Sequence, residues 1–139
     1  MRADAFVDTN ILLYAISTAP EEAARKQRAR EILAQPDWGL SIQVLQEFYV
    51  NATRPPQPAM RHEDAEAAIR QLLLRPVADN NAALLLDALR LKARYQLSYW
   101  DAAIVAAAVQ LGASVLYSED LQDGQEIEGV TVVNPFPKA

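Results

Sequence analysis

One long segment, YWDAAIVAAAVQLG at residues 99–112, is almost free of polar side chains. Its spacing predicts a helix that starts near Tyr99 and ends at Gly112, a residue type that favours helix C-termini. Because this helix is apolar on nearly every face, it must be buried. Apolar residues make up 51% of the 139 residues, which is enough for one core.

Short apolar runs alternate with helical patterns along the chain. Strands are predicted at residues 5–7, 38–42, 115–117 and 130–133, with a very short one near 77. Further helices are predicted at residues 10–15, 20–34, 43–53, 61–74 and 80–95. This alternation predicts an α/β fold, a three-layer α/β/α sandwich with a mainly parallel central sheet. No repeat or linker interrupts the pattern, so we expect a single domain over residues 1–139.

The residue types exclude several kinds of site. The chain has no cysteine, which rules out disulfides, thiolate zinc sites and a cysteine nucleophile. The only histidine, His62, lies beside a Pro-rich connection and is predicted to be a surface residue. No Gly-x-Ser-x-Gly motif occurs that would point to a serine hydrolase. Any catalysis must therefore rest on carboxylates.

The net charge is −5, from 13 Lys and Arg against 18 Asp and Glu. This balance argues against broad, non-specific nucleic-acid binding, which needs a basic surface, but it suits a basic partner protein. A local excess of acids is also expected wherever carboxylates bind cations. The first residues lack the apolar run of a signal peptide, and no stretch approaches the ~20 apolar residues of a membrane span. We expect a cytoplasmic protein with no membrane association.

Two acids follow predicted strands. Asp8 comes directly after the strand at 5–7, and Asp120 comes shortly after the strand at 115–117. Ligand sites in open α/β sheets lie at the carboxyl ends of strands, so both positions suit a functional acid. The alternatives remain open that Asp8 caps the following helix and that Asp120 is an ordinary turn residue.

Two further acids lie on helices. Asp101 is the only charged residue between Arg94 and Glu119, and it falls in the first turn of the apolar helix, where the helix dipole stabilises an anion. Ser98 and Asp101 also match a capping box, and the carboxylate can serve both purposes. Glu47 flanks the apolar stripe of the helix at 43–53, where an acid is partly desolvated unless it is paired, bound to a cation or able to reach water.

The combination is more informative than any one of the four acids. Two strand ends, one helix N-terminus and one helix flank can converge at the same edge of the sheet. Several ionised carboxylates cannot share a small volume without cations. Hard divalent ions with oxygen ligands are the expected partners of such a cluster.

The same segments resemble the PIN-domain family, in particular VapC-type toxin ribonucleases. The resemblance covers essentially the whole chain and rests on four motifs in order. These are Phe6-Val7-Asp8-Thr9-Asn10, Ser41-Ile42-Gln43-Val44-Leu45-Gln46-Glu47-Phe48, Ser98-Tyr99-Trp100-Asp101-Ala102-Ala103 and Leu116-Tyr117-Ser118-Glu119-Asp120-Leu121.

The resemblance implies roles for individual residues. Asp8, Glu47, Asp101 and Asp120 would be the metal-binding and catalytic acids. Asn10 and Ser118 would support them by holding a carboxylate, a water or a phosphate. The family commonly continues the fourth motif as Asp-x-Asp-Phe, and this chain departs from that pattern. Either Asp120 or Asp123 could thus be the fourth acid, and Asp120 is the prediction.

The resemblance also implies a function. The chain would be a Mg²⁺- or Mn²⁺-dependent endoribonuclease that hydrolyses RNA phosphodiester bonds, with bound metal activating the attacking water. It would be the toxin of a toxin–antitoxin pair, inhibited by a cognate antitoxin protein, and it could form a homodimer. The apolar helix faces near residues 11–15 and 23–33 are candidate antitoxin-docking surfaces, although core packing explains them equally well.

Two other functions compete with this one. The first is a non-catalytic PIN-fold module that binds RNA or acts as a scaffold, which the irregular fourth motif favours. The second is a phosphatase of the haloacid-dehalogenase type, although that chemistry normally needs Asp-x-Asp and position 10 here is Asn. A dinucleotide site is not expected, because the first strand is not followed by Gly-x-Gly-x-x-Gly.

Overall fold

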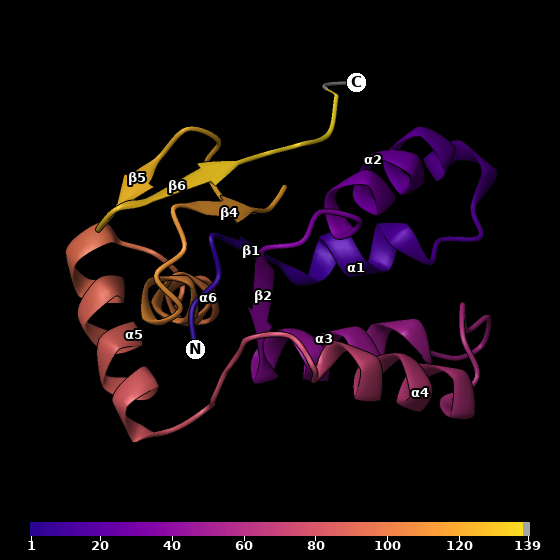
Figure 1. Cartoon of the computed structure of the whole chain (residues 1–139), viewed down its shortest axis with the longest axis horizontal. Helices are drawn as coiled ribbons and strands as arrows, with labels where there is room; N and C mark the ends of the chain where they lie inside the picture. The colour runs from indigo at the N-terminus through magenta and orange to yellow at the C-terminus, as the bar shows by residue number, and fades with distance from the viewer. Residues whose placement is uncertain (138–139) are drawn as a thin grey trace.

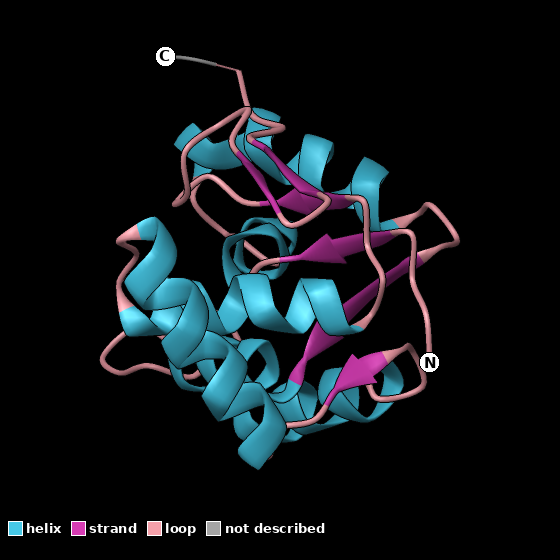
Figure 2. Cartoon of the chain, turned by 90° about the vertical axis from the view of Figure 1, so that its left-hand side faces the viewer, coloured by secondary structure: helices cyan, strands magenta, loops and turns pink. Residues whose placement is uncertain are grey.

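The computed structural model describes residues 1–137, so the last two residues of the predicted domain lie outside the described residues. Six strands form one sheet in the order β3-β2-β1-β4-β6-β5. Figure 2 draws the strands in magenta and the helices in cyan. They are β1 Ala5–Val7, β2 Trp38–Ser41, β3 Val77–Ala78, β4 Val115–Tyr117, β5 Glu126–Ile127 and β6 Val130–Val133. Neighbouring strands are parallel except β5 and β6, which confirms the predicted mainly parallel sheet.

Helices cover both sides of this sheet. They are α1 Thr9–Ala15, α2 Ala23–Leu33, α3 Ile42–Ala52, α4 His62–Leu72, α5 Ala82–Tyr95 and α6 Tyr99–Gln110. Figure 1 shows α5 and α6 on one side of the strands and α1 to α4 on the other, which confirms the three-layer α/β/α prediction. Within residues 1–137, no helix has the length and apolar character needed to cross a membrane.

The buried helix predicted from its composition is α6. It contacts α5 on one side and β2, β3 and β6 on the other, and every residue from Ala102 to Ala108 is buried. The helix begins after Ser98, whose side chain accepts a hydrogen bond from the backbone N–H of Asp101. It ends just before Gly112, whose φ of +73° is the left-handed conformation typical of a residue after a helix.

Two details of local structure were predicted wrongly. The helix predicted at 20–34 is divided, because Pro20–Glu22 form a 3₁₀ turn and Glu22 leaves the helical conformation with φ −100° and ψ 11°. Strand β5 was not predicted. It pairs with β6 through Glu128 and Gly129, whose φ values are +51° and +90°, as a tight two-residue hairpin turn requires.

Candidate functional site

The strand order brings three of the predicted motifs to neighbouring positions. Strand β1 lies between β2 and β4, and all three are parallel. Asp8 follows β1, helix α3 with Glu47 follows β2, and Ser118 and Asp120 follow β4. Because the carboxyl ends of parallel strands meet at one edge, these groups gather there.

Asp8 is the buried centre of this edge, with only 6% of its surface exposed. One carboxylate oxygen, Oδ1, accepts a hydrogen bond from the backbone N–H of Thr9 at 2.7 Å, so the capping role is confirmed. The other, Oδ2, accepts from the Ser118 hydroxyl at 2.7 Å. Burial raises the pKa of Asp8 to about 6, more than these two hydrogen bonds lower it, and the negative charges of Asp120 and Glu47 add to the rise.

The predicted supporting residues Asn10 and Ser118 connect the first and fourth motifs. The Asn10 amide nitrogen donates to Asp120 Oδ2 at 3.1 Å and to Ser118 Oγ at 3.4 Å, and the Asn10 oxygen accepts from the Glu119 backbone N–H at 3.4 Å. Ser118 is fully buried, and its hydroxyl also accepts from the backbone N–H of Asp120 at 3.1 Å. The loop after β4 is therefore held against the start of α1.

Glu47 is held by a residue that was not singled out from the sequence. The Thr9 hydroxyl donates to Glu47 Oε1 at 2.6 Å. Thr9 is buried at the first position of α1, so it joins Asp8 through its backbone and Glu47 through its side chain. The sequence signal that could have found this residue was a threonine directly after the strand-end acid Asp8.

Asp101 reaches the same group of charges from the other side of the sheet. It is partly buried in the first turn of α6. Burial raises its pKa, the Ser98 side chain opposes that rise, and the negative charges of Asp120 and Glu47 add to it. The backbone N–H of Asp101 thus donates to the cap residue Ser98, while the Asp101 carboxylate is influenced by the other acids.

The two acids of the fourth motif have different surroundings. Asp120 is exposed and accepts from Asn10. Asp123 is also exposed, but its Oδ1 accepts from the backbone N–H of Asn134 at 2.9 Å, a contact that orders the chain after β6. Asp120 therefore faces the other predicted acids, whereas Asp123 caps a turn.

No described Lys or Arg forms an ion pair with any of the four predicted acids in residues 1–137. Burial is the main reason that the pKa values of Asp8 and Asp101 are raised, and the negative charges of Asp120 and Glu47 add to both rises. In the same residues, no group of three or more acidic, histidine or cysteine side chains stands close enough to hold one metal ion. The donor set suits a hard cation that keeps several waters and takes one or two carboxylates directly, as Mg²⁺ commonly does.

A hollow of about 200 Å³ opens beside these acids. Its walls come from α1, α3 and the loop after β4. The lining residues are Thr9, Asn10, Leu13, Glu47, Asn51 and Asp120. Polar atoms of the site therefore face a space that solvent or a ligand can enter.

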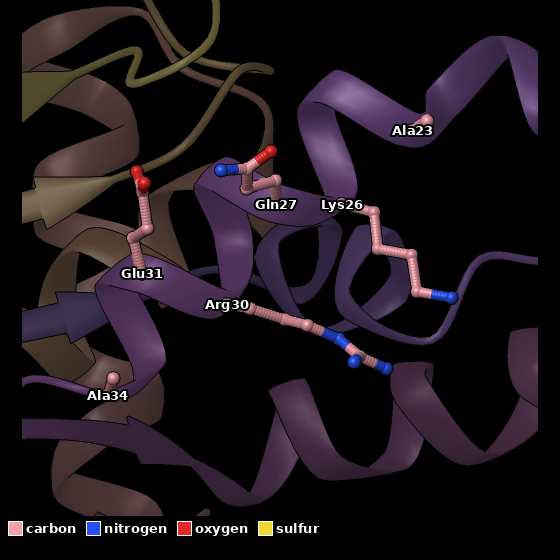
Figure 3. A pocket seen from close by; sticks show the side chains of 6 residues that line it. All are labelled: Ala23, Lys26, Gln27, Arg30, Glu31 and Ala34. Carbon is pink, nitrogen blue, oxygen red and sulfur yellow. The ribbon is translucent and has the colours of Figure 1, made fainter.

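A larger hollow of about 470 Å³ lies on α2 (Figure 3). None of the four acids lines it, and Arg30 on its wall donates to the Ala15 carbonyl at 2.9 Å.

The two helix faces named as candidate docking surfaces pack inside this chain, because their apolar residues are buried in its own core. These are Ile11, Leu12 and Ala15 on α1 and Ala29 and Ile32 on α2.

Comparison with known sequences and structures identifies the family. The sequence model of the PIN domain matches residues 5–122, the span that contains all four acids. The chain belongs to the PIN-domain family. Membership of this family supports a nuclease, and no curated protein gives a significant match that would define the function further.

Solved structures that this chain resembles in fold include toxin–antitoxin proteins. One is a toxin–antitoxin complex from Klebsiella pneumoniae, with a TM-score of 0.70 and 22% identity, covering 95% of this chain and 98% of that one. Another is VapC20 of Mycobacterium tuberculosis, a sarcin-ricin loop cleaving toxin, with a TM-score of 0.65 and 25% identity, covering 82% and 88%. A third is DNA-bound VapBC from Salmonella typhimurium, with a TM-score of 0.64 and 20% identity, covering 95% and 97%.

Proposed function

We propose that this PIN domain is a divalent-metal-dependent endoribonuclease and the toxin of a toxin–antitoxin pair. The observation that carries the proposal is the group of uncompensated carboxylates at the carboxyl ends of β1 and β4, with Asp8 buried among them. A buried acid with a raised pKa and acidic neighbours weakens the fold unless a cation is bound. Membership of a nuclease family points to phosphodiester hydrolysis as the use of that cation.

The residues divide into two groups under this proposal. Asp8, Glu47, Asp101 and Asp120 would hold Mg²⁺ or Mn²⁺, some of them through water. When bound, the ion would stabilise charge on the phosphate and make water easier to deprotonate. Asn10 and Ser118 would keep Asp8 and Asp120 oriented through the hydrogen bonds that connect them.

The substrate's phosphate cannot approach this acidic edge without a cation, because both carry negative charge. RNA would therefore bind only to protein whose carboxylates already hold a metal ion. Hydrolysis then joins a water oxygen to phosphorus, while the bond from phosphorus to the leaving sugar oxygen breaks.

Cleavage of RNA by the purified chain tests the proposal. We expect hydrolysis with Mg²⁺ or Mn²⁺, none with excess EDTA, and loss of activity in Asp8→Asn and Asp101→Asn. Asp120→Asn and Asp123→Asn form a matched pair in one loop, of which only the first should impair cleavage. Activity that persists in Asp101→Asn, or in EDTA, would contradict this site.

A second candidate function is a PIN-fold module that binds RNA without cleaving it. The separation of the acids, no three of which form a compact cluster in residues 1–137, favours this reading. Calorimetric titration with Mn²⁺ distinguishes the nuclease from the non-catalytic module. A nuclease should bind Mn²⁺ in wild-type form and lose affinity in Asp101→Asn, whereas a scaffold need not bind the ion at these acids.

The partner proposal follows from the fold neighbours, which include toxin–antitoxin complexes. We expect a cognate antitoxin to bind this chain and block cleavage, and the net charge of −5 suits a basic partner. Co-purification from the native source, followed by mass spectrometry, tests this expectation. A chain that is harmless when expressed alone would count against the toxin role.

A further inference from the structure

A second hollow adjoins the acids, and the proposed metal ion and phosphate would not occupy it. Its volume is about 330 Å³, and it shares Glu47 and Asn51 with the hollow beside Asp120. The remaining lining residues are Gln43, Gln46, Val50 and Trp100. The two hollows therefore share a wall on α3. The first is otherwise lined in part by the acid Asp120, and the second by amide side chains and the indole ring of Trp100.

Trp100 is the unusual member of this lining. Its residue surface is 64% exposed, whereas Trp38, the other tryptophan, is 4% exposed. The Trp100 carbonyl accepts from the buried Gln43 side chain at 3.3 Å, and the Trp100 ring meets the Tyr99 ring edge-on at 5.0 Å between centroids. An indole ring that lines an open hollow, instead of packing in the core, suits contact with a ligand.

We propose that Trp100 is a stacking platform for an unpaired base of the RNA whose phosphate lies at the neighbouring acids. This inference rests on the proposed function, and it adds a residue that would position the RNA beside the acids. Trp100 and Glu47, a predicted metal ligand, line the same hollow, so a base stacked on the ring would lie beside that acid. Bases of unpaired RNA commonly stack on aromatic side chains in this way.

The charge of the shared wall supports a base rather than a phosphate in this hollow. Glu47 repels an anion, whereas a neutral base can lie beside it without an ion. The Asn51 amide nitrogen donates to the Glu47 carbonyl of its own helix at 2.8 Å, which leaves the Asn51 amide oxygen to accept from a base. The Gln46 amide offers both a donor and an acceptor on the same wall.

Tryptophan fluorescence provides the test, because Trp100 is exposed and Trp38 is buried. The probes are a mixed-sequence single-stranded RNA of about ten nucleotides and its duplex, with Ca²⁺ in place of Mg²⁺ to limit hydrolysis. We expect the single strand to quench the fluorescence. Trp100→Ala should weaken single-strand binding by about tenfold and leave duplex binding unchanged, while Trp100→Phe should retain most of the affinity.

Leu86→Ala is the matched control, since Leu86 is also an exposed apolar residue (65%) but lies on α5. Equal binding by wild type and Trp100→Ala would overturn the proposal, as would a wild type that binds no single-stranded RNA. A change in solution mass on Trp100→Ala, with RNA affinity intact, would also overturn it by assigning the ring to a contact between copies of the chain.

The outcomes separate this inference from the proposed function. Binding that depends on Trp100, in a protein that cleaves no RNA with or without Mg²⁺ or Mn²⁺, refutes the proposed hydrolysis and keeps the base site. Cleavage that depends on Asp101, in a Trp100→Ala variant with wild-type affinity and KM, refutes the base site and keeps hydrolysis.

Discussion

Replacing Asp8 by asparagine should stabilise the metal-free protein at neutral pH while removing its activity. The pKa of Asp8 is raised from 3.8 to about 6, chiefly by burial. A shift of about two pKa units corresponds to about 3 kcal/mol of destabilisation when the carboxylate is charged. Asparagine removes that charge but keeps only one of the two hydrogen bonds from Thr9 and Ser118, at a cost of about 1 kcal/mol. The net gain is about 2 kcal/mol, or a rise in Tm of roughly 6 °C.

The sign of the pH dependence follows from the direction of the shift. The folded state binds the Asp8 proton more tightly than the unfolded state does. Wild-type stability should therefore fall as pH rises from about 4 through about 6 because of Asp8, and this contribution should be absent in Asp8→Asn. The partly buried Asp101 acts in the same direction in both proteins, so the comparison isolates Asp8.

Thermal unfolding in EDTA, followed by circular dichroism at about pH 4.5 and about pH 7.5, measures both effects. The advantage of Asp8→Asn should appear at the higher pH and shrink at the lower one, and exposed Asp123→Asn serves as the control. Added Mn²⁺ should raise the Tm of wild type more than that of Asp8→Asn, because ligand binding stabilises only a protein that binds it. A variant less stable than wild type in EDTA at about pH 7.5 would refute the electrostatic reasoning.

Substitutions at three other positions test the structure in different ways. Thr9→Val removes the hydroxyl that holds Glu47 and should weaken Mn²⁺ binding severalfold in calorimetry, whereas Thr9→Ser should retain the wild-type affinity. Equal affinities of wild type and Thr9→Val would show that the hydrogen bond does not position the acid. Gly39→Ala should lower the free energy of unfolding by about 1–3 kcal/mol in urea, because the added Cβ would lie 2.6 Å from the Pro76 carbonyl oxygen, and an unchanged midpoint would contradict that close approach. Ser98→Ala should cost about 1 kcal/mol in the same assay through loss of the α6 cap, and a neutral effect would mean that another group satisfies the helix end.

The strongest sequence signals were those in which one physical requirement dominated. An apolar segment with a single charge had to form a buried helix, and α6 is that helix. The runs before Asp8 and after Ala113 were short, apolar and bounded by polar residues, and they form β1 and β4 side by side. The hairpin of β5 was missed because its two-residue strand is too short to show a period, and Glu128 adopts a positive φ that its residue type does not predict.

Individual contacts within the site lay beyond the sequence pattern. Helical periodicity placed Glu47 at the edge of an apolar stripe but could not show that Thr9 would hold it across 38 positions of sequence. The fourth motif likewise left both Asp120 and Asp123 open as the fourth acid, with Asp120 as the prediction. Their difference depends on the direction of the chain after β4, which turns Asp120 towards Asn10 and leaves Asp123 to cap the backbone at Asn134.

The strand order explains why these acids gather around β1. Strands β2 and β3 lie on one side of β1 within the sheet, and β4, β6 and β5 lie on the other. The order of strands therefore reverses at β1. In open α/β sheets, ligands bind at the carboxyl ends of the strands beside such a reversal, and the hollow next to Asp120 opens there. Asp8 is fixed at the end of β1 as the cap of α1, with Ser118 donating to its Oδ2. The residue that caps the first helix is therefore also the most deeply buried of the four predicted acids, so the same fold that starts α1 sets the raised pKa of Asp8.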